Sequence, residues 1–186
     1  MKTIFITGYK SHEIGIFKND DPAVRIIRKS IRQHLVSLAD EGLEWVLVSG
    51  SLGVELWAAE EVISLKETLP ELKLAILTPF LNQEEKWSEG NQSYYHDIIK
   101  KADFVSSISN KPYTDPSQFK NRDDFILQKA DGLLVIYDED KKGSPSFLLE
   151  KAEKENMTYN LDIIRINFQD LQWIADEEAL SESEPD

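Results

Sequence analysis

A glycine-containing turn at residues 49–55 is the first place in this sequence where residue types and spacing suggest chemistry. The segment Ser49-Gly50-Ser51-Leu52-Gly53-Val54-Glu55 follows an apolar run, 45–48, and opens a helix-like pattern. Glycine lets the backbone approach an anion closely, and the free amides and dipole of a helix N-terminus favour negative charge. The turn therefore predicts a binding site for phosphate or pyrophosphate. The alternative is a purely structural turn, because glycine turns between strand and helix also occur in α/β proteins that bind nothing there.

A second turn of this kind follows the first apolar run of the chain. Residues 3–7 read as a buried strand, and Gly8-Tyr9-Lys10 place a glycine, an aromatic ring and a cation directly after it. Ligands of open parallel sheets bind at the carboxyl ends of the strands, above all where the strand order reverses. The alternative is that Gly8 only turns the chain and Tyr9 only packs in the core.

Basic residues are also placed near the loops that follow strands. An ionised arginine offers a planar fork that suits bidentate phosphate binding, and lysines add positive charge. A local cationic mouth would hold one small anionic ligand, while chance scatter of the 21 lysines and arginines is the alternative. These residues are Lys10, Lys111, Lys120, Arg122, Lys141 and Lys142.

Elements that would position these residues alternate along the chain. Continuous apolar runs, typical of strands covered on both faces of a parallel sheet, lie at 3–7, 45–48, 74–77, 104–105, 133–137 and 163–166. Helical spacing or composition is found between them, at 22–38, 54–67, 83–102, 118–129 and 145–155. Asp21-Pro22 supplies a start signal for the first helix and Gly42 a stop. The alternation predicts an α/β fold, a single-domain, Rossmann-like, doubly wound and mostly parallel sheet.

Length and charge bound the function further. A chain of 186 residues with 41% hydrophobic content fits one domain, expected at 1–175, followed by a mobile acidic tail at 176–186. The formal net charge of -13 argues against a nucleic acid as partner, because such binding depends on neutralising phosphates. We expect negligible affinity for single-stranded DNA.

Cysteine is absent and no long apolar run occurs. The lack of cysteine excludes disulfides, cysteine-zinc sites, iron-sulfur clusters and thiol nucleophiles. The amino terminus has only three consecutive large apolar residues, Ile4-Phe5-Ile6, too few for a signal peptide, and nothing later approaches a membrane span. The expected location is the cytoplasm, without membrane contact, and we expect no metal site, since His12, His34 and His96 show no ligand spacing.

Several of these segments together resemble a known family. Phe119-Lys120-Asn121-Arg122, Ala130-Asp131-Gly132 and Gly143-Ser144-Pro145, with the turn at 49–55, look like the Rossmann-like core of the SLOG superfamily, which includes DNA-processing protein A and the LOG phosphoribohydrolases. Within it, Thr7-Gly8-Tyr9-Lys10 and the runs 44–50 and 53–60 are similar to the YpsA-like family. The resemblance covers nearly the whole chain except the acidic tail.

The resemblance implies a nucleotide-derived ligand, with NAD or ADP-ribose as candidate, and an association with cell division in Gram-positive bacteria. The DNA-processing relatives bind single-stranded DNA, which the acidic charge of this chain does not favour. The LOG enzymes carry a glycine-rich loop with a catalytic glutamate after the fifth strand. Here the corresponding segment, 138–145, has the single glycine Gly143, which places N-glycosidic hydrolysis in doubt.

Glu55 is the residue with competing roles. It would accept hydrogen bonds from ribose hydroxyls, act at an anomeric carbon as the candidate catalytic residue, or merely place a favourable charge at a helix N-terminus. Gly53→Ala is expected to weaken ligand binding and leave the fold largely intact. Candidate ligand-binding residues are Gly8, Tyr9, Lys10, Ser49, Gly50, Ser51, Gly53, Glu55, Trp57, Thr78, Pro79, Phe80, Arg122, Asp138, Gly143 and Ser144.

Aromatic residues near these turns are candidates for stacking on a base, although most are expected in the core. They are Tyr9, Trp57, Phe80, Trp87, Tyr94, Tyr95 and Tyr113. The leading hypothesis is a nucleotide-binding or sensor domain with its crevice at the carboxyl ends of the first, second and fifth strands. An N-glycosidase-like enzyme and a protein-interaction module with a vestigial pocket are the alternatives. Base identity, protein partners and a homo-oligomer stay open.

Overall fold

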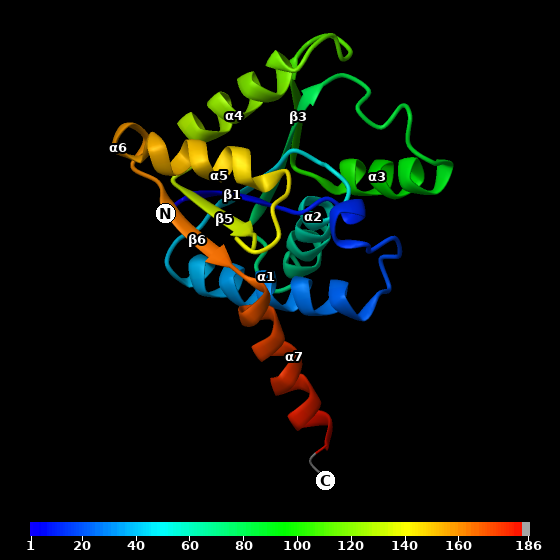
Figure 1. The fold of residues 1–186 in the computed structure, drawn as a ribbon, viewed down its shortest axis with the longest axis vertical. Helices are drawn as coiled ribbons and strands as arrows, with labels where there is room; N and C mark the ends of the chain where they lie inside the picture. The colour runs from blue at the N-terminus through cyan, green and yellow to red at the C-terminus, as the bar shows by residue number, and fades with distance from the viewer. Residues whose placement is uncertain (184–186) are drawn as a thin grey trace.

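Six parallel strands form one sheet in the order β4-β3-β2-β1-β5-β6, in a computed structural model that describes residues 1–183 (Figure 1). The chain steps outward from β1 to β4 and then returns to the other side of β1 with β5, so the strand order reverses there. The predicted α/β, Rossmann-like fold is confirmed. The strands are β1 (Thr3–Gly8), β2 (Trp45–Val48), β3 (Lys73–Phe80), β4 (Phe104–Ser109), β5 (Gly132–Ile136) and β6 (Asp162–Ile166).

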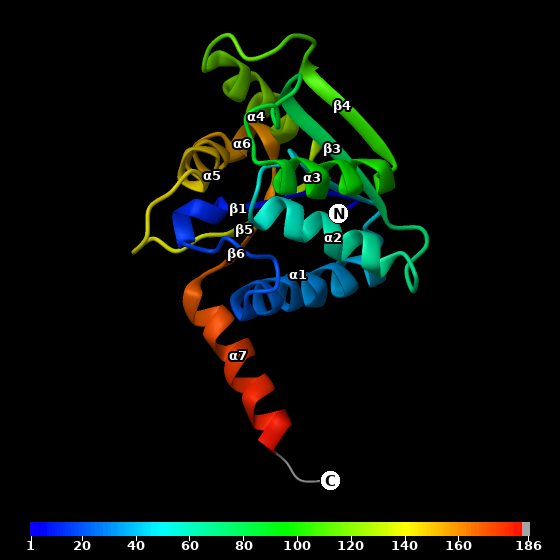
Figure 2. The ribbon, with the colours of Figure 1, turned by 90° about the vertical axis from the view of Figure 1, so that its right-hand side faces the viewer.

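Helices cover both faces of the sheet, which is why its central strands are continuously apolar. Helices α1 (Pro22–Asp40), α2 (Val54–Leu65) and α3 (Glu89–Lys101) pack side by side on one face. Helices α4 (Ser117–Lys129) and α5 (Pro145–Lys154) pack on strands from the other face. Figure 2 shows the strands between the two groups. The core is therefore two apolar layers, one on each side of β1, β2, β3 and β5.

Helix α1 follows its sequence signals closely. The Asp21 side chain accepts a hydrogen bond from the Ala23 amide at 2.9 Å, and Pro22 occupies the first helical position. This arrangement caps the helix where free amides would otherwise remain. The predicted apolar face is buried, with Val24, Ile27, Ile31, Leu35 and Leu38 against the core.

Helix α3 begins six residues later than the sequence predicted. The expected helix was 83–102, but Asn82 adopts a left-handed conformation (φ 56°) and residues 81–87 form turns. Ser88 caps the helix instead, because its hydroxyl accepts from the Asn91 amide at 3.3 Å. This leaves the side chain of Gln83 directed at the turn after β2, where it donates to the Ser49 carbonyl at 3.0 Å.

The C-terminal segment forms helix α7 (Phe168–Ser183), which follows the short helix α6 (Asn156–Tyr159) and β6. A mobile acidic tail was predicted from 176, whereas the structure continues the helix and pairs Glu178 with Arg25 (3.2 Å) and Lys29 (3.3 Å) of α1. In Figure 1, α7 runs past α1 and projects beyond the rest of the molecule. The last three residues of the predicted tail, 184–186, lie outside the described residues. Within 1–183 no helix is both long and apolar enough to cross a membrane.

Candidate functional site

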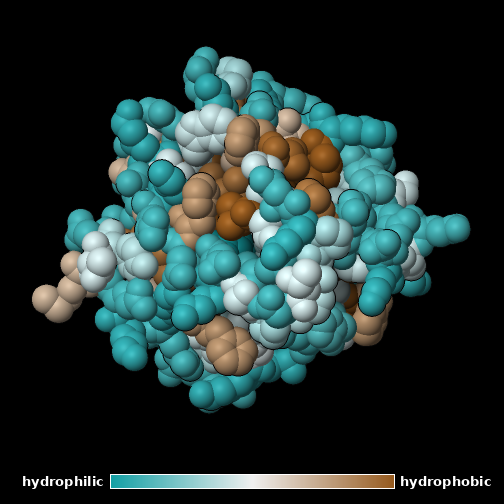
Figure 3. Space-filling view, turned by 90° about the horizontal axis from the view of Figure 1, so that it is seen from above, coloured by the Kyte–Doolittle hydropathy of each residue, from teal (hydrophilic) through white to brown (hydrophobic). Residues whose placement is uncertain are grey.

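A cavity of about 980 Å³ lies at the carboxyl ends of β1, β2 and β3, between these strands and helices α4 and α5. Side chains of β1 form its floor, the turn after β2 and the end of β3 form one side, and the two helices form the other. The face seen in Figure 3 has an apolar area enclosed by hydrophilic residues. The sequence predicted a crevice at the ends of the first, second and fifth strands; the structure opens it toward β3, and the segment after β5 contributes its rim through Ser144 and Pro145.

A second cavity, about 610 Å³, lies between α1 and α7, away from the strand ends. Its lining is mainly aliphatic, and three of its four charged residues pair with one another, Arg25 with both Glu178 and Glu182, while Lys141 is the fourth. It lacks the convergent polar groups that orient a small ligand. The cavity at the strand ends, called the strand-end pocket below, is therefore the candidate functional site.

Positive charge gathers in the strand-end pocket although the whole chain is acidic. Its basic lining residues are Lys10, Lys120, Arg122 and Lys151, and its acidic lining residues are Glu55 and Asp123. Within the described part of the chain, the side chains of Lys10 and Lys120 have no ion-pair partner. Two ammonium groups are thus available to an anionic ligand.

Arg122 is held in place by two neighbours. Its guanidinium forms an ion pair with Asp123 at 2.7 Å, and its Nη1 donates to the Ser49 hydroxyl at 3.1 Å. Burial raises the pKa of Asp123 above its usual value, although the adjacent Arg122 charge opposes that rise. Lys151 is likewise paired, with Asp124. These contacts fix the orientation of the α4 and α5 cations at the pocket wall.

Aromatic rings form much of the apolar wall. Phe80 and Phe119 meet edge to face with ring centroids 5.4 Å apart, and the Arg122 guanidinium lies 5.7 Å from the Phe119 ring. Phe147 of α5 also lines the pocket and is 76% exposed, which is unusual for so large an apolar side chain. An exposed ring at the mouth of a cationic pocket can stack on a planar base.

The Glu55 carboxylate binds the backbone amides that the sequence analysis predicted would bind a phosphate. It is 4% exposed and accepts hydrogen bonds from the backbone amides of Ser49 (2.9 Å) and Ser51 (3.2 Å). The hydroxyls of Thr7 (2.8 Å) and Ser49 (2.9 Å) bond to the same carboxylate. A carboxylate has about four lone-pair sites, so protein donors already engage this one fully. Glu55 organises the turn between β2 and α2 and, with Thr7 and Ser51, forms the inner end of the strand-end pocket.

Gly53 faces protein backbone and not the pocket. It has φ +110°, and a Cβ there would lie 2.6 Å from both the Ser11 amide nitrogen and the Tyr9 carbonyl oxygen. The expectation that Gly53→Ala leaves the fold largely intact is therefore wrong, because an alanine would be strained and would clash with the backbone after β1. Gly50 (φ +81°) is similarly enclosed, with Gln83 and Tyr95 as neighbours.

Tyr9 joins the segment after β1 to the loop after β5. Its ring is buried, its hydroxyl accepts from the Asp138 amide at 2.9 Å and donates to the Lys141 carbonyl. The ring lies so close to Gly143 that a Cβ on this glycine would be 2.9 Å from it. These three predicted residues, Tyr9, Asp138 and Gly143, shape the pocket rim by packing and do not line its surface.

Glu13 makes a second link between the same two segments, and sequence analysis missed it. Its carboxylate accepts from the Lys10 amide (2.7 Å), the Ser144 amide (2.7 Å) and the Ser144 hydroxyl (2.9 Å). Partial burial opposes ionisation, but these hydrogen bonds hold the pKa of Glu13 below its usual value. The carboxylate therefore caps the start of α5 from the short helix η1 (Ser11–Ile14).

Half of the predicted ligand-binding residues line the strand-end pocket. Those that do are Gly8, Lys10, Ser51, Glu55, Pro79, Phe80, Arg122 and Ser144. The remaining ones are buried or packed beside it: Tyr9, Ser49, Gly50, Gly53, Trp57, Thr78, Asp138 and Gly143. Trp57 illustrates the difference, because it is 1% exposed and its indole donates to the Asn19 side chain at 2.9 Å. No part of residues 1–183 gathers three or more His, Asp or Glu side chains in an arrangement suited to a metal ion.

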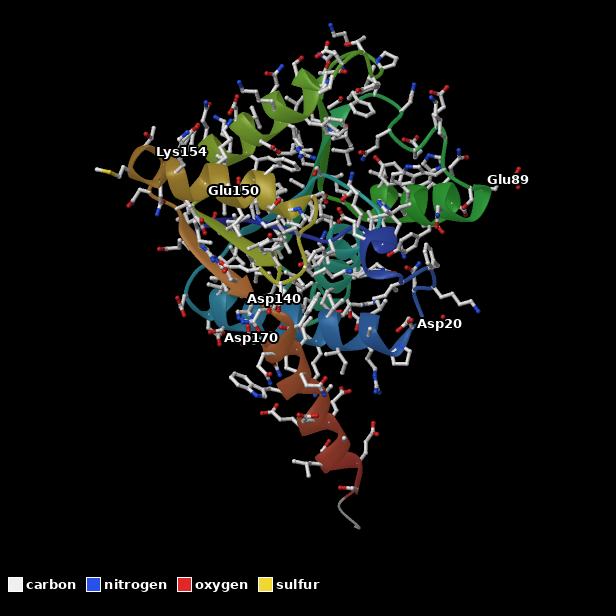
Figure 4. The ribbon with its side chains drawn as sticks, viewed as in Figure 1. Asp20, Glu89, Asp140, Glu150, Lys154 and Asp170 are labelled. Carbon is white, nitrogen blue, oxygen red and sulfur yellow. The ribbon has the colours of Figure 1, made fainter. Side chains whose placement is uncertain are left out.

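Phe119, Phe147 and Lys151 line the pocket but were not among the predicted ligand-binding residues. Phe147 lies two residues after Pro145, in the first turn of α5. Surface acids are dispersed, by contrast. In Figure 4, Asp20, Glu89, Asp140, Glu150 and Asp170 lie on five different segments of the ribbon.

Comparison with known proteins extends these observations to a family. The model of the YspA SLOG family matches residues 4–171. A UPF0398 protein of Halalkalibacterium halodurans is 51% identical over 98% of this chain and 97% of its own length. UPF0398 proteins of Bacillus cereus (48% identical) and Bacillus thuringiensis (49% identical) match over 99% of this chain and 100% of their own lengths.

Proposed function

Since this chain belongs to the YspA SLOG family over most of its length, we propose that its strand-end pocket binds a nucleotide-derived ligand of the NAD or ADP-ribose class. The observation that carries the proposal is one cavity of about 980 Å³ in which an aromatic wall faces unpaired lysines. A nucleotide needs both surfaces, because its base is planar and apolar on its faces while its phosphates are anionic.

The phosphates are assigned to the cations and not to the glycine turn. The Ser49 and Ser51 amides already bind the Glu55 carboxylate, so a phosphate there would have to displace an internal anion. Lys10 and Lys120 approach the pocket from opposite sides, the β1 end and α4, and Arg122 adds a fixed guanidinium. Charged groups of this kind suit a diphosphate held across the cavity.

The base is assigned to the aromatic wall. Phe147 is exposed at the mouth and Phe119 lies deeper, beside Phe80. A ribose between base and phosphates would then lie near Thr7 and Glu55 on the floor. In this arrangement Glu55 supports the site through the turn it organises, and a direct bond to ribose requires it to exchange a protein donor for a hydroxyl.

The proposal is tested by thermal denaturation of the wild-type protein with NAD, ADP-ribose, AMP and cyclic dinucleotides. A ligand at about 100 times its dissociation constant stabilises the folded state by about 2.7 kcal/mol, a readily measured shift in melting temperature. AMP hydrolysis assayed in the same samples distinguishes binding alone from N-glycosidic cleavage. A protein that shows no shift with any of these ligands would favour the protein-interaction module.

A further inference from the structure

Strand β4 is an edge of the sheet, and no strand within residues 1–183 pairs with its outer side (Figure 2). Its six residues, Phe-Val-Ser-Ser-Ile-Ser, carry no charge, although 30% of the whole chain is charged. Phe104 is 51% and Val105 42% exposed. Edge strands of soluble proteins are usually protected from pairing by lysine, proline, a bulge or a covering segment. Residues 104–109 include neither a lysine nor a proline.

The hydrogen-bond pattern shows which backbone groups of β4 are free. In a parallel sheet, alternate residues of a strand bond to alternate neighbours. Lys73 donates to the Glu44 carbonyl next to β2, and the Leu74 carbonyl accepts from the Asp103 amide next to β4. The register pairs Ile76 with Val105 and Thr78 with Ser107, so these β3 residues bond to the β4 residues on either side of their partners, 104, 106 and 108. The amides and carbonyls of Val105 and Ser107 consequently point away from the sheet.

We propose that β4 pairs antiparallel with β4 of a second copy of this chain, about a two-fold axis at Ser106. In this register Val105 exchanges backbone hydrogen bonds with the partner's Ser107, and Ser107 with the partner's Val105. Phe104 lies opposite the partner's Ile108 on one face of the joined sheet, and Ser106 lies opposite its own copy. Each strand contains both residue types of every such pair, so two identical strands can form all of these pairs at once. The edge is therefore complementary to itself.

Charges at the ends of the strand favour the same partner. Asp103 precedes β4, where its carboxylate pairs with Lys66 of the same chain and accepts the Leu74 amide, and Lys111 follows β4 by two residues. Antiparallel pairing about Ser106 places Asp103 diagonally across from the partner's Lys111 at each end of the interface. Two copies that each carry a net charge of -13 repel overall, but along this edge they meet as uncharged strands flanked by opposite charges.

Sedimentation of the wild-type chain and two valine variants tests the interface. Wild type is expected to sediment as a species of twice the 21.4 kDa chain mass. Val105→Lys is expected to sediment as a monomer, whereas Val36→Lys, a control at a 38% exposed valine of α1, remains a dimer. A wild-type monomer, or a dimer that survives Val105→Lys, would overturn the proposal.

Cysteine cross-linking tests the register. The chain has no cysteine, so Ser106→Cys introduces a single thiol, and the proposed axis places it against the same thiol of the partner. The Ser106 pair lies between the hydrogen-bonded pairs, where the Cβ atoms are close enough for a disulfide. Oxidation is expected to give a covalent dimer with Ser106→Cys and not with Ser37→Cys, an exposed position on α1. Equal cross-linking of the two variants, or none with Ser106→Cys, would contradict this register.

Discussion

At the scale of single residues, Glu55 determines the geometry of the turn between β2 and α2. One buried carboxylate collects two backbone amides and two hydroxyls from β1 and from the turn itself. The sequence placed Glu55 correctly beside a glycine turn and at a helix start. It could not show that the side chain folds back onto the amides of its own turn, because that depends on the tertiary position of Thr7.

We expect Glu55→Gln to lower the free energy of unfolding by about 2 to 3 kcal/mol, because hydrogen bonds to a charged acceptor are lost and an amide donor then faces backbone amides. Urea denaturation measures the difference. Glu44→Gln is the matched control, since Glu44 forms an exposed pair with Lys2 and should change stability by less than about 1 kcal/mol. Equal losses of unfolding free energy in the two variants would contradict the structural role assigned to Glu55.

Gly53 supports a second prediction at this scale. Gly53→Ala should lower the free energy of unfolding by about 2 kcal/mol or more, because a Cβ would meet backbone atoms at 2.6 Å and the residue has φ +110°. Gly90→Ala is the control, because Gly90 lies in α3 with open space around its Cβ position and alanine favours a helix. Equal stability of the two alanine variants would contradict the close contact between Gly53 and the backbone that follows β1.

At the scale of elements, two links tie the segment after β1 to the loop after β5. Tyr9 bonds to the backbone of that loop, and Glu13 caps the start of α5. Both links cross about 130 positions of sequence, which is why no local pattern indicated them. The strands and most helices could be predicted because apolar runs, caps and glycines are local signals; the start of α3 could not, since a left-handed Asn82 turn competes with helical spacing.

The Glu13 link makes stability depend on pH. The folded state lowers the pKa of Glu13 from its ordinary value of 4.5, so the link contributes fully above that value and is lost as the pH falls through the lower folded-state pKa. Glu13→Gln should reduce the unfolding free energy by about 1 kcal/mol at neutral pH. Denaturation of both proteins along a pH series should show this difference shrinking below pH 4.5. If the difference in unfolding free energy between the two proteins instead grew on acidification, the folded state would raise the pKa of Glu13 and not lower it.

At the scale of the whole molecule, an acidic body surrounds a pocket with more basic than acidic lining residues. The net charge of -13 could be read from composition, and several of the basic residues of the pocket were indicated by their position after strands. The aromatic wall was less accessible to prediction. Phe119 and Phe147 belong to different helices, and only the packing of α4 and α5 on the same face brings them to one cavity.

The charge distribution predicts discrimination between a nucleotide and a nucleic acid. A single ligand with two phosphates can be held inside the cationic pocket, whereas a polymer would place further phosphates against the acidic surface. Filter binding at physiological salt should therefore detect no single-stranded DNA. Submicromolar binding would contradict this expectation and would require a basic surface elsewhere.

Calorimetric titration of ADP-ribose into wild type, Lys120→Glu and Lys129→Glu measures whether the strand-end pocket holds a nucleotide through its cations. Both lysines are exposed on α4, but only Lys120 lines the pocket. Loss of a charged hydrogen bond corresponds to about one to two decades in affinity. We expect binding by wild type and Lys129→Glu and a loss of that size in Lys120→Glu. Absence of binding by wild type, or equal affinity of the two variants, would contradict it.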